Sequence, residues 1–164
     1  MKKIYFLLLT ILFAATSINA QVTVTATAGT PGPTAYVTLK DAFDALNAGT
    51  HQGAITISLT GNTTETASAV LNSGAVAPAV YTSVSITATV PVTISGSITG
   101  AVIKLNGADN VTIDGRIAAA GRNITVQNTS TASATAAIWV ASVAAGNGAS
   151  GNTIRNLELL TGID

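Results

Sequence analysis

The chain has 164 residues, no cysteine, and 7 basic against 7 acidic residues, so its formal net charge is zero. Its 48% of hydrophobic residues exclude a disordered, highly charged tail, and without a cluster of Lys and Arg we expect no nucleic acid partner. The length suits one domain with a core of its own.

The first twenty residues have the three parts of a secretory signal peptide. Lys2 and Lys3 form a basic start, residues 4–15 are largely apolar, and residues 16–20 (TSINA) form a small-residue exit. The apolar run is shorter than the roughly 20 residues that span a bilayer. We expect cleavage between Ala20 and Gln21, export as a secreted or cell-surface protein, and no membrane span after cleavage.

Residues 21–53 are predicted to form an N-terminal strand and one short amphipathic helix. Residues 21–28 (QVTVTATA) alternate with the two-residue period of a strand. Thr38 suits a helix N-cap, Asp41 stands at the third position of a capping box, and Gly49 suits the helix stop. The apolar face of this helix consists of Leu39, Ala42, Phe43 and Leu46.

Residues 54–164 consist of short β-branched segments separated by Gly, Asn, Ser and Ala. Several segments follow an asparagine, namely Asn110, Asn123 and Asn152, at intervals of 13 and 29 residues, which is a loose repeat. The predicted strands are 54–59, 84–88, 92–95, 102–105, 111–114, 124–127, 137–141 and 153–159.

Two all-β architectures fit many short strands without intervening helices. An antiparallel sandwich favours tight Asn-Gly or Asp-Gly hairpins, and only Asn106-Gly, Asp114-Gly and Asn147-Gly occur. A parallel β-solenoid needs corners, which asparagine suits because it tolerates left-handed backbone angles. The lone helix then caps the first rung. We therefore expect a right-handed parallel β-helix with an N-terminal capping strand and helix.

A family resemblance supports the same fold. The runs LKDAFDALNAGTHQGAITISLTGNTTETA, VIKLNGADNVTIDGR and GNTIRNLEL resemble the N-terminal part of secreted bacterial β-helix proteins of the pectate-lyase-like superfold. The resemblance covers most of residues 36–162 and implies a large cell-surface protein. This fold hosts lyases, hydrolases, adhesins and inert stalks, so the resemblance implies no single activity.

The C-terminal residues predict that the protein continues beyond residue 164. Residues 156–160 (NLELL) are predicted to be part of a strand. A solenoid that stopped there would expose an apolar edge, which is an aggregation hazard. We therefore expect further rungs or domains of a longer protein.

The binding candidate is Trp139, the only tryptophan. Alternation places Ile138 and Val140 in the core and Trp139 outside. If the rungs stack, Gln127 and Arg155 lie near the indole ring, and the three side chains could bind a surface glycan. The alternative is that the loop at residues 144–151 covers the ring.

The two acids in KLNGADNVTIDGR (residues 104–116) are the candidates for catalysis. Asp114 is expected to be exposed, whereas Asp109 lies in a corner where Asp commonly makes turns. The acids of the mature chain are dispersed, and neither a carboxylate pair nor a calcium cluster is recognisable. His51, the only histidine, is expected in a loop or cap. We predict no catalytic residue, no metal site and no cofactor.

The preferred function is therefore a non-enzymatic, exported cell-surface module with a structural or adhesive role, whose partner is a glycan or a protein. The alternative is the N-terminal part of a carbohydrate-active lyase or hydrolase, whose catalytic rungs lie beyond residue 164. The downstream sequence distinguishes the two, because clustered acids there would favour the enzyme.

Overall fold

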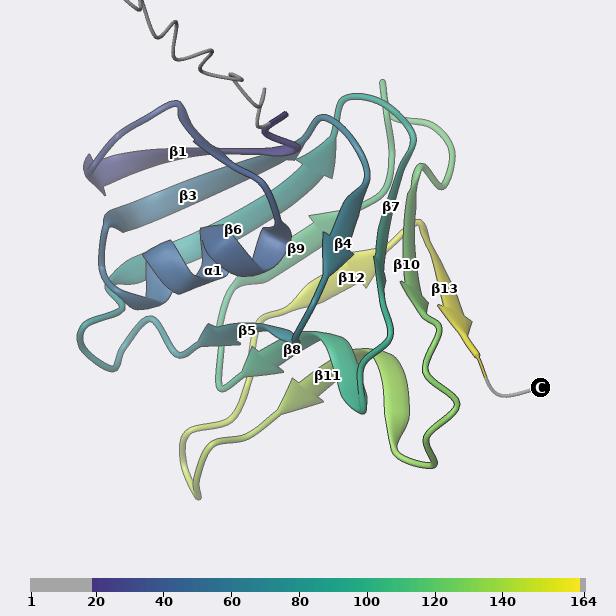
Figure 1. The fold of residues 1–164 in the computed structure, drawn as a ribbon. Coiled ribbons are helices and arrows are strands. Elements are labelled where there is room, and N and C mark those ends of the chain that lie inside the picture. Colours follow the sequence, from purple (N-terminus) through teal and green to yellow (C-terminus); the bar gives the residue numbers. More distant parts are fainter. Residues whose placement is uncertain (1–18, 163–164) are drawn as a thin grey trace, which may run out of the picture.

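The computed structural model describes residues 19–162, which form a parallel β-solenoid of about 3 turns (Figure 1). Each full turn contributes one strand to each of three sheets, and the strands of successive turns pair in parallel. The parallel strands of sheet A are β3 (His51–Leu59), β6 (Tyr81–Ala88), β9 (Val111–Asp114) and β12 (Thr153–Arg155). Sheet B contains β4 (Thr63–Glu65), β7 (Val92–Gly96), β10 (Ile124–Asn128) and β13 (Leu157–Thr161). Sheet C contains β5 (Ala69–Asn72), β8 (Gly100–Asn106) and β11 (Thr135–Ala141). This confirms the predicted fold class.

The core is built from columns of apolar side chains that point inward from successive rungs. In sheet A, Ile57 pairs with Ile86, Ile86 with Ile113, and Ile113 with Ile154. The first three isoleucines are fully buried. β-branched side chains stack well on a pleated surface, so the alternation within each strand is what places these columns inside.

The N-terminal end of the solenoid is covered, as predicted. β1 (Val22–Gly29) pairs antiparallel with β3, and β2 (Thr34–Tyr36) pairs antiparallel with β1. The helix α1 (Leu39–Asn47) has the predicted capping box of Thr38 and Asp41, and its apolar face is buried. Glu65 of β4 accepts hydrogen bonds from the amides of Leu39 and Lys40, which ties the helix N-terminus to the first rung.

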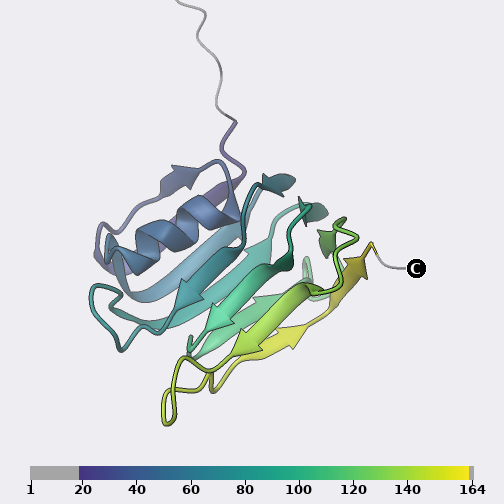
Figure 2. The same cartoon turned by 60° about the horizontal axis from the view of Figure 1, so that its bottom comes forward.

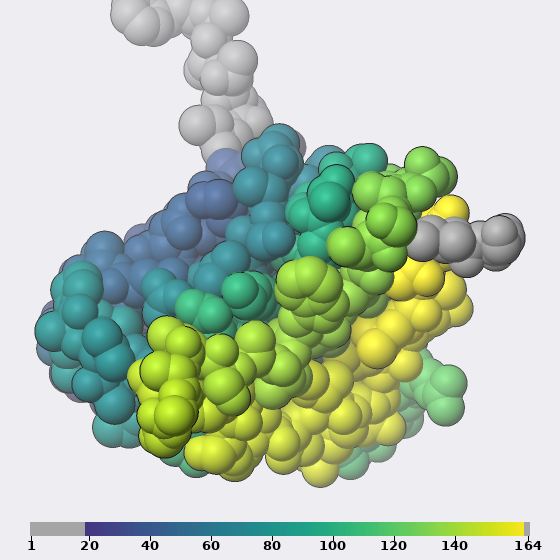
Figure 3. All heavy atoms as spheres, turned by 90° about the horizontal axis from the view of Figure 1, so that it is seen from below, coloured from purple at the N-terminus to yellow at the C-terminus, as the bar shows by residue number. Residues whose placement is uncertain are grey.

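The C-terminal end is open in the described residues. β11, β12 and β13 are the edge strands of the three sheets, and they lie together at this end (Figure 2). Their inward side chains continue the core columns but have no rung above them. Ile154 is 37% exposed and Leu159 is 51% exposed. Residues from β11 to β13, coloured yellow-green and yellow, form much of the face seen in Figure 3.

Three strands were not predicted, and one predicted strand is divided. β2, β4 and β5 contain only three or four residues each, too short to show a period. The predicted strand at 153–159 is two strands, because Asn156 has φ 56° and turns the corner between them. Asn110 has φ 57°, so asparagine does adopt left-handed angles at corners of this solenoid.

Residues 1–18 lie outside the described part of the chain, so the predicted signal peptide and its cleavage site stay predictions. Within residues 19–162 no helix combines the length and the hydropathy that crossing a bilayer requires.

Candidate functional site

The prediction that Asp114 is exposed is wrong. Asp114 points away from the core, but only 8% of its surface is accessible, because two arginines cover it. Its carboxylate accepts hydrogen bonds from Arg116 Nη2 at 2.7 Å, Arg155 Nε at 3.0 Å and Asn156 Nδ2 at 3.2 Å. The hydrogen bonds from the Arg116 side chain are the main reason that the pKa of this carboxyl lies well below its usual range. A carboxylate held this way is a poor general base.

Asp109 has a different set of partners. Its Oδ1 accepts hydrogen bonds from the amide and the hydroxyl of Ser150, at 2.6 and 2.7 Å, and so ties the loop before β12 to the corner before β9. Asp109 and Asp114 are therefore each committed to separate structural contacts. Among residues 19–162, no three His, Cys, Asp or Glu side chains gather in a way that could hold a metal ion.

His51 is fully buried at the start of β3. Its Nδ1 lies 2.6 Å from the carbonyl of Thr30, and its Nε2 lies 2.7 Å from the hydroxyl of Tyr36. Because a carbonyl only accepts, we assign the proton to Nδ1, and Nε2 then accepts from the tyrosine. The histidine thus links β3 to β2 and to the turn that precedes β2.

The three residues of the predicted binding surface lie on different sheets. Trp139 belongs to β11 of sheet C, Gln127 to β10 of sheet B, and Arg155 to β12 of sheet A. Arg155 is engaged by Asp114. No single sheet face therefore carries all three, although Trp139 points outward as expected and is 41% exposed.

The neighbours of Trp139 on the outer face of sheet C come from β8 and β5. Trp139 is in register with Lys104 of β8, and Lys104 is in register with Val70 of β5. A Cβ placed on Gly100 would lie 3.9 Å from Cζ3 of the indole, so the ring extends over the start of β8. The outer face of sheet C thus combines an exposed aromatic ring with a partly exposed lysine.

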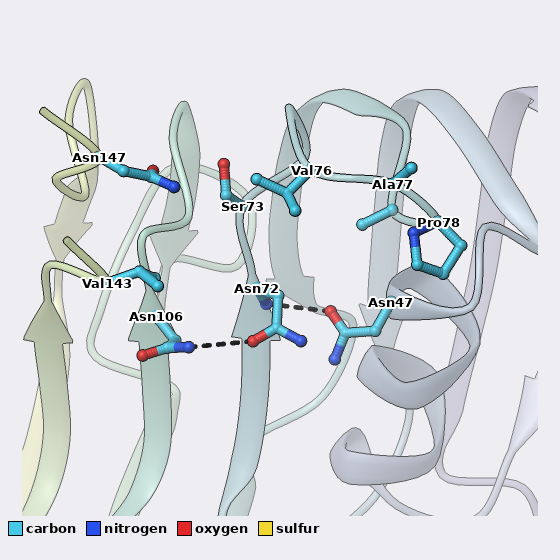
Figure 4. A pocket seen from close by; sticks show the side chains of 10 residues that line it. Asn47, Asn72, Ser73, Val76, Ala77, Pro78, Asn106, Val143 and Asn147 are labelled. Carbon is cyan, nitrogen blue, oxygen red and sulfur yellow. Dashed lines mark hydrogen bonds between the residues drawn. The ribbon is translucent and has the colours of Figure 1, made fainter.

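A row of amides lies at the other end of the sheet C strands. Asn106 Nδ2 donates to Asn72 Oδ1 at 3.1 Å, and the backbone N–H of Asn72 donates to Asn47 Oδ1 of α1 at 3.0 Å (Figure 4). We call Asn47, Asn72 and Asn106 the amide row. Sequence reasoning missed it, although the 34-residue spacing between Asn72 and Asn106 equals the spacing of the Ala69–Ile103 pair in the same sheet.

A cavity of about 160 Å³ opens beside the amide row. The loop before β6 contributes Val76 and Pro78 to its wall, and the turn after β11 contributes Val143 and Asn147 (Figure 4). No charged side chain lines it. The cavity therefore offers neutral amides on one side and apolar groups on others, a combination that suits a neutral polar ligand.

A scan against protein-family models finds no match for the chain, and searches of curated proteins and of solved structures find no relative. The β-solenoid thus rests on the strand order and register described above. Its expected place in the pectate-lyase-like superfold remains an expectation.

Proposed function

We propose that the chain is an exported, non-enzymatic β-solenoid module of a cell-surface protein, and that the outer face of sheet C binds a glycan. The observation that carries the proposal is Trp139, an exposed indole on a sheet face. Aromatic faces stack on sugar rings, and flanking polar groups fix their orientation. Lys104 is one strand away in register, about 4.8 Å by the usual strand spacing, and so can donate to a sugar hydroxyl.

A binding role fits the state of the acidic residues better than a catalytic one. Hydrolysis of a glycoside needs one carboxyl that can donate a proton and a second carboxylate facing it. Asp114 is held ionised by arginines, and Asp109 is bonded to Ser150. Asp114 is therefore a poor proton donor, and the two carboxylates are held by separate sets of partners.

The open end supports a place within a longer solenoid. The columns that end at Ile154 and Leu159 have the register of the rungs below them, and the edge strands carry unpaired backbone groups. A further rung of short strands with apolar inward residues would bury these side chains and pair the edges. The N-terminal end is covered by β1, β2 and α1 and offers no equivalent surface, so further rungs would pack on the C-terminal end.

The binding proposal is tested with Trp139→Ala on a glycan array and by calorimetry with the sugars that the unsubstituted protein binds. We expect binding to fall at least about tenfold, the loss of roughly 1.4 kcal/mol of stacking, while the thermal midpoint is unchanged. Val140→Ala is the matched control, because Val140 is the next residue on the same strand, is in register with the buried Leu105, and so faces the opposite way. A glycan signal that survives Trp139→Ala unchanged would remove the proposal.

The export proposal has its own test. The full chain expressed in a Gram-negative bacterium is expected outside the cytoplasm with Gln21 as its first residue, as read by N-terminal sequencing. A chain lacking residues 2–20 is expected to stay inside the cell. Cytoplasmic retention of the full chain would contradict export.

A further inference from the structure

The amide row ends in a carbonyl oxygen without a protein partner. Asn106 uses its Nδ2 to reach Asn72, and its Oδ1 receives no hydrogen bond from residues 19–162. The side-chain amide of Asn147, across the cavity, also has no hydrogen-bond partner in this part of the chain. Figure 4 shows the oxygen of Asn106 pointing away from Asn72, toward the side of β11.

The side-chain carbonyl of Asn106 has no partner because the amide row does not continue on β11. The residue in register with Asn106 on β11 is Ala141, which has no polar side chain. An asparagine there would donate to Asn106 as Asn106 donates to Asn72, because neighbouring strands are about 4.8 Å apart. The sequence thus places a methyl group where the next amide of the row would stand.

The turn after β11 closes one side of this gap. Gly107 has φ 69°, and a Cβ there would come within 2.7 Å of Val143 Cγ2 and 3.2 Å of Asn147 Oδ1. The bare glycine therefore lets the turn approach the end of the amide row. Val143 supplies an apolar surface beside it, and Val76 supplies another across the cavity.

From this geometry we propose that the cavity binds the acetamido group of an N-acetylated amino sugar, a site that rests on the proposed glycan-binding function. The acetamido N–H donates to Asn106 Oδ1 and takes the place of the missing amide. Its carbonyl accepts from the Asn147 side chain, and its methyl packs on Val143. A cavity of roughly 150 Å³ can hold a six-atom ring such as benzene, so one acetamido group with its attached carbon fits.

The acetamido group is favoured over a plain hexose because it repeats the amide-to-amide hydrogen bond that Asn106 makes with Asn72. An amide that joins a row of amides offers one donor and one acceptor in one plane, which a single hydroxyl does not. The absence of charged lining residues disfavours acidic sugars and phosphate, because neither would find a counter-charge.

The test compares the trimer of N-acetylglucosamine with the trimer of glucose, by calorimetry on the folded protein. We expect the acetylated trimer to bind more tightly, and Asn106→Leu to weaken it about tenfold without changing the glucose trimer. Asn147→Ala is expected to act in the same direction. Asn62→Ala is the matched control, since this corner asparagine lies just before β4 of sheet B and does not line the cavity.

Ala141→Asn gives the sharpest test, because it fills the gap. It is expected to abolish the preference for the acetylated trimer while the thermal midpoint is kept or raised, a result that a damaged fold does not produce. Equal affinity of the unsubstituted protein for both trimers overturns this inference and leaves the proposed function standing. Binding of neither trimer, with the array also silent, overturns both.

Discussion

The carboxylate of Asp114 accepts a hydrogen bond at 3.0 Å from Arg155 Nε, although the two residues are 41 positions apart. They are in register on β9 and β12, so the contact joins the third rung to the fourth. Arg116, two residues after Asp114, contacts the same carboxylate from the corner. Asp114, which the sequence offered as a candidate for catalysis, therefore connects successive rungs of the solenoid.

Asp114→Asn is expected to lower the free energy of unfolding by about 1–2 kcal/mol, measured by urea denaturation at pH 7. The substitution removes charge-assisted hydrogen bonds, each worth roughly 1.5–3 kcal/mol when well buried. We expect a loss of unfolding free energy near the low end of the range for such hydrogen bonds, because the Arg116 and Arg155 side chains are 35% and 50% exposed. Asp44→Asn is the matched control. Its pair with Lys40 is a solvent-exposed i,i+4 contact on α1, so its removal should cost under about 0.5 kcal/mol.

The Asp114 carboxylate should also make the free energy of unfolding depend on pH. Its pKa is lowered in the folded protein, so the unfolded chain binds the proton more readily. The stabilisation is present in full above the ordinary aspartate pKa of about 3.9 and is lost as the pH falls toward the folded-state value. The unsubstituted protein should therefore lose more stability than Asp114→Asn between about pH 4 and pH 2. Identical slopes for the two proteins would contradict this assignment.

Glu65→Ala should destabilise the cap on the first rung. Glu65 is 2% exposed, and its two oxygens accept from the first two amides of α1, each at 3.0 Å. Those amides are otherwise free at a helix N-terminus, where negative charge is favoured. We expect a loss of about 2–3 kcal/mol by urea denaturation. Thr38→Ala, which removes the side-chain N-cap of the same helix, should cost only about 1 kcal/mol. Equal costs would mean that Glu65 does not anchor the helix.

The elements that the sequence predicts well are those whose signal is local. The capping box of Thr38 and Asp41 and the alternation in residues 111–114 depend on neighbouring residues, and both were confirmed. Glu65 was not recognised, because its partners lie 25 and 26 residues away on the helix. The amide row and the two distant partners of Asp114, Arg155 and Asn156, were missed for the same reason. Their contacts depend on the length of each turn, which varies with the loops between sheets.

Asn128→Asp tests a polar group inside the solenoid. Asn128 is fully buried at the end of β10. Its Nδ2 donates to the carbonyls of Ile98, Gly100 and Ala136, and its Oδ1 accepts from two amides. Aspartate has the same shape but sets an oxygen against three carbonyls and buries a charge. We expect a loss of about 3 kcal/mol or more, or no folded protein.

The control for Asn128→Asp is Asn62→Asp, at an exposed corner where only the side-chain oxygen is used, to accept from the amide of Thr93. Aspartate keeps that oxygen, so the cost should be under about 0.5 kcal/mol. Thermal unfolding followed by circular dichroism measures both variants. Similar midpoints for the two would show that the Asn128 amide is not required at this corner.

Substitutions in the isoleucine column of sheet A test whether a further rung packs on the C-terminal end. Ile113→Ala removes three buried carbons between two rungs and should cost about 3–4 kcal/mol by urea denaturation. Ile154→Ala makes the same chemical change one rung later, where the side chain is 37% exposed, and should cost about 1 kcal/mol. In a chain extended by further rungs, Ile154 becomes an interior member of the column. Its substitution should then cost nearly as much as that of Ile113, because the same carbons leave a cavity. An unchanged cost in the longer chain would mean that no rung stacks on β12.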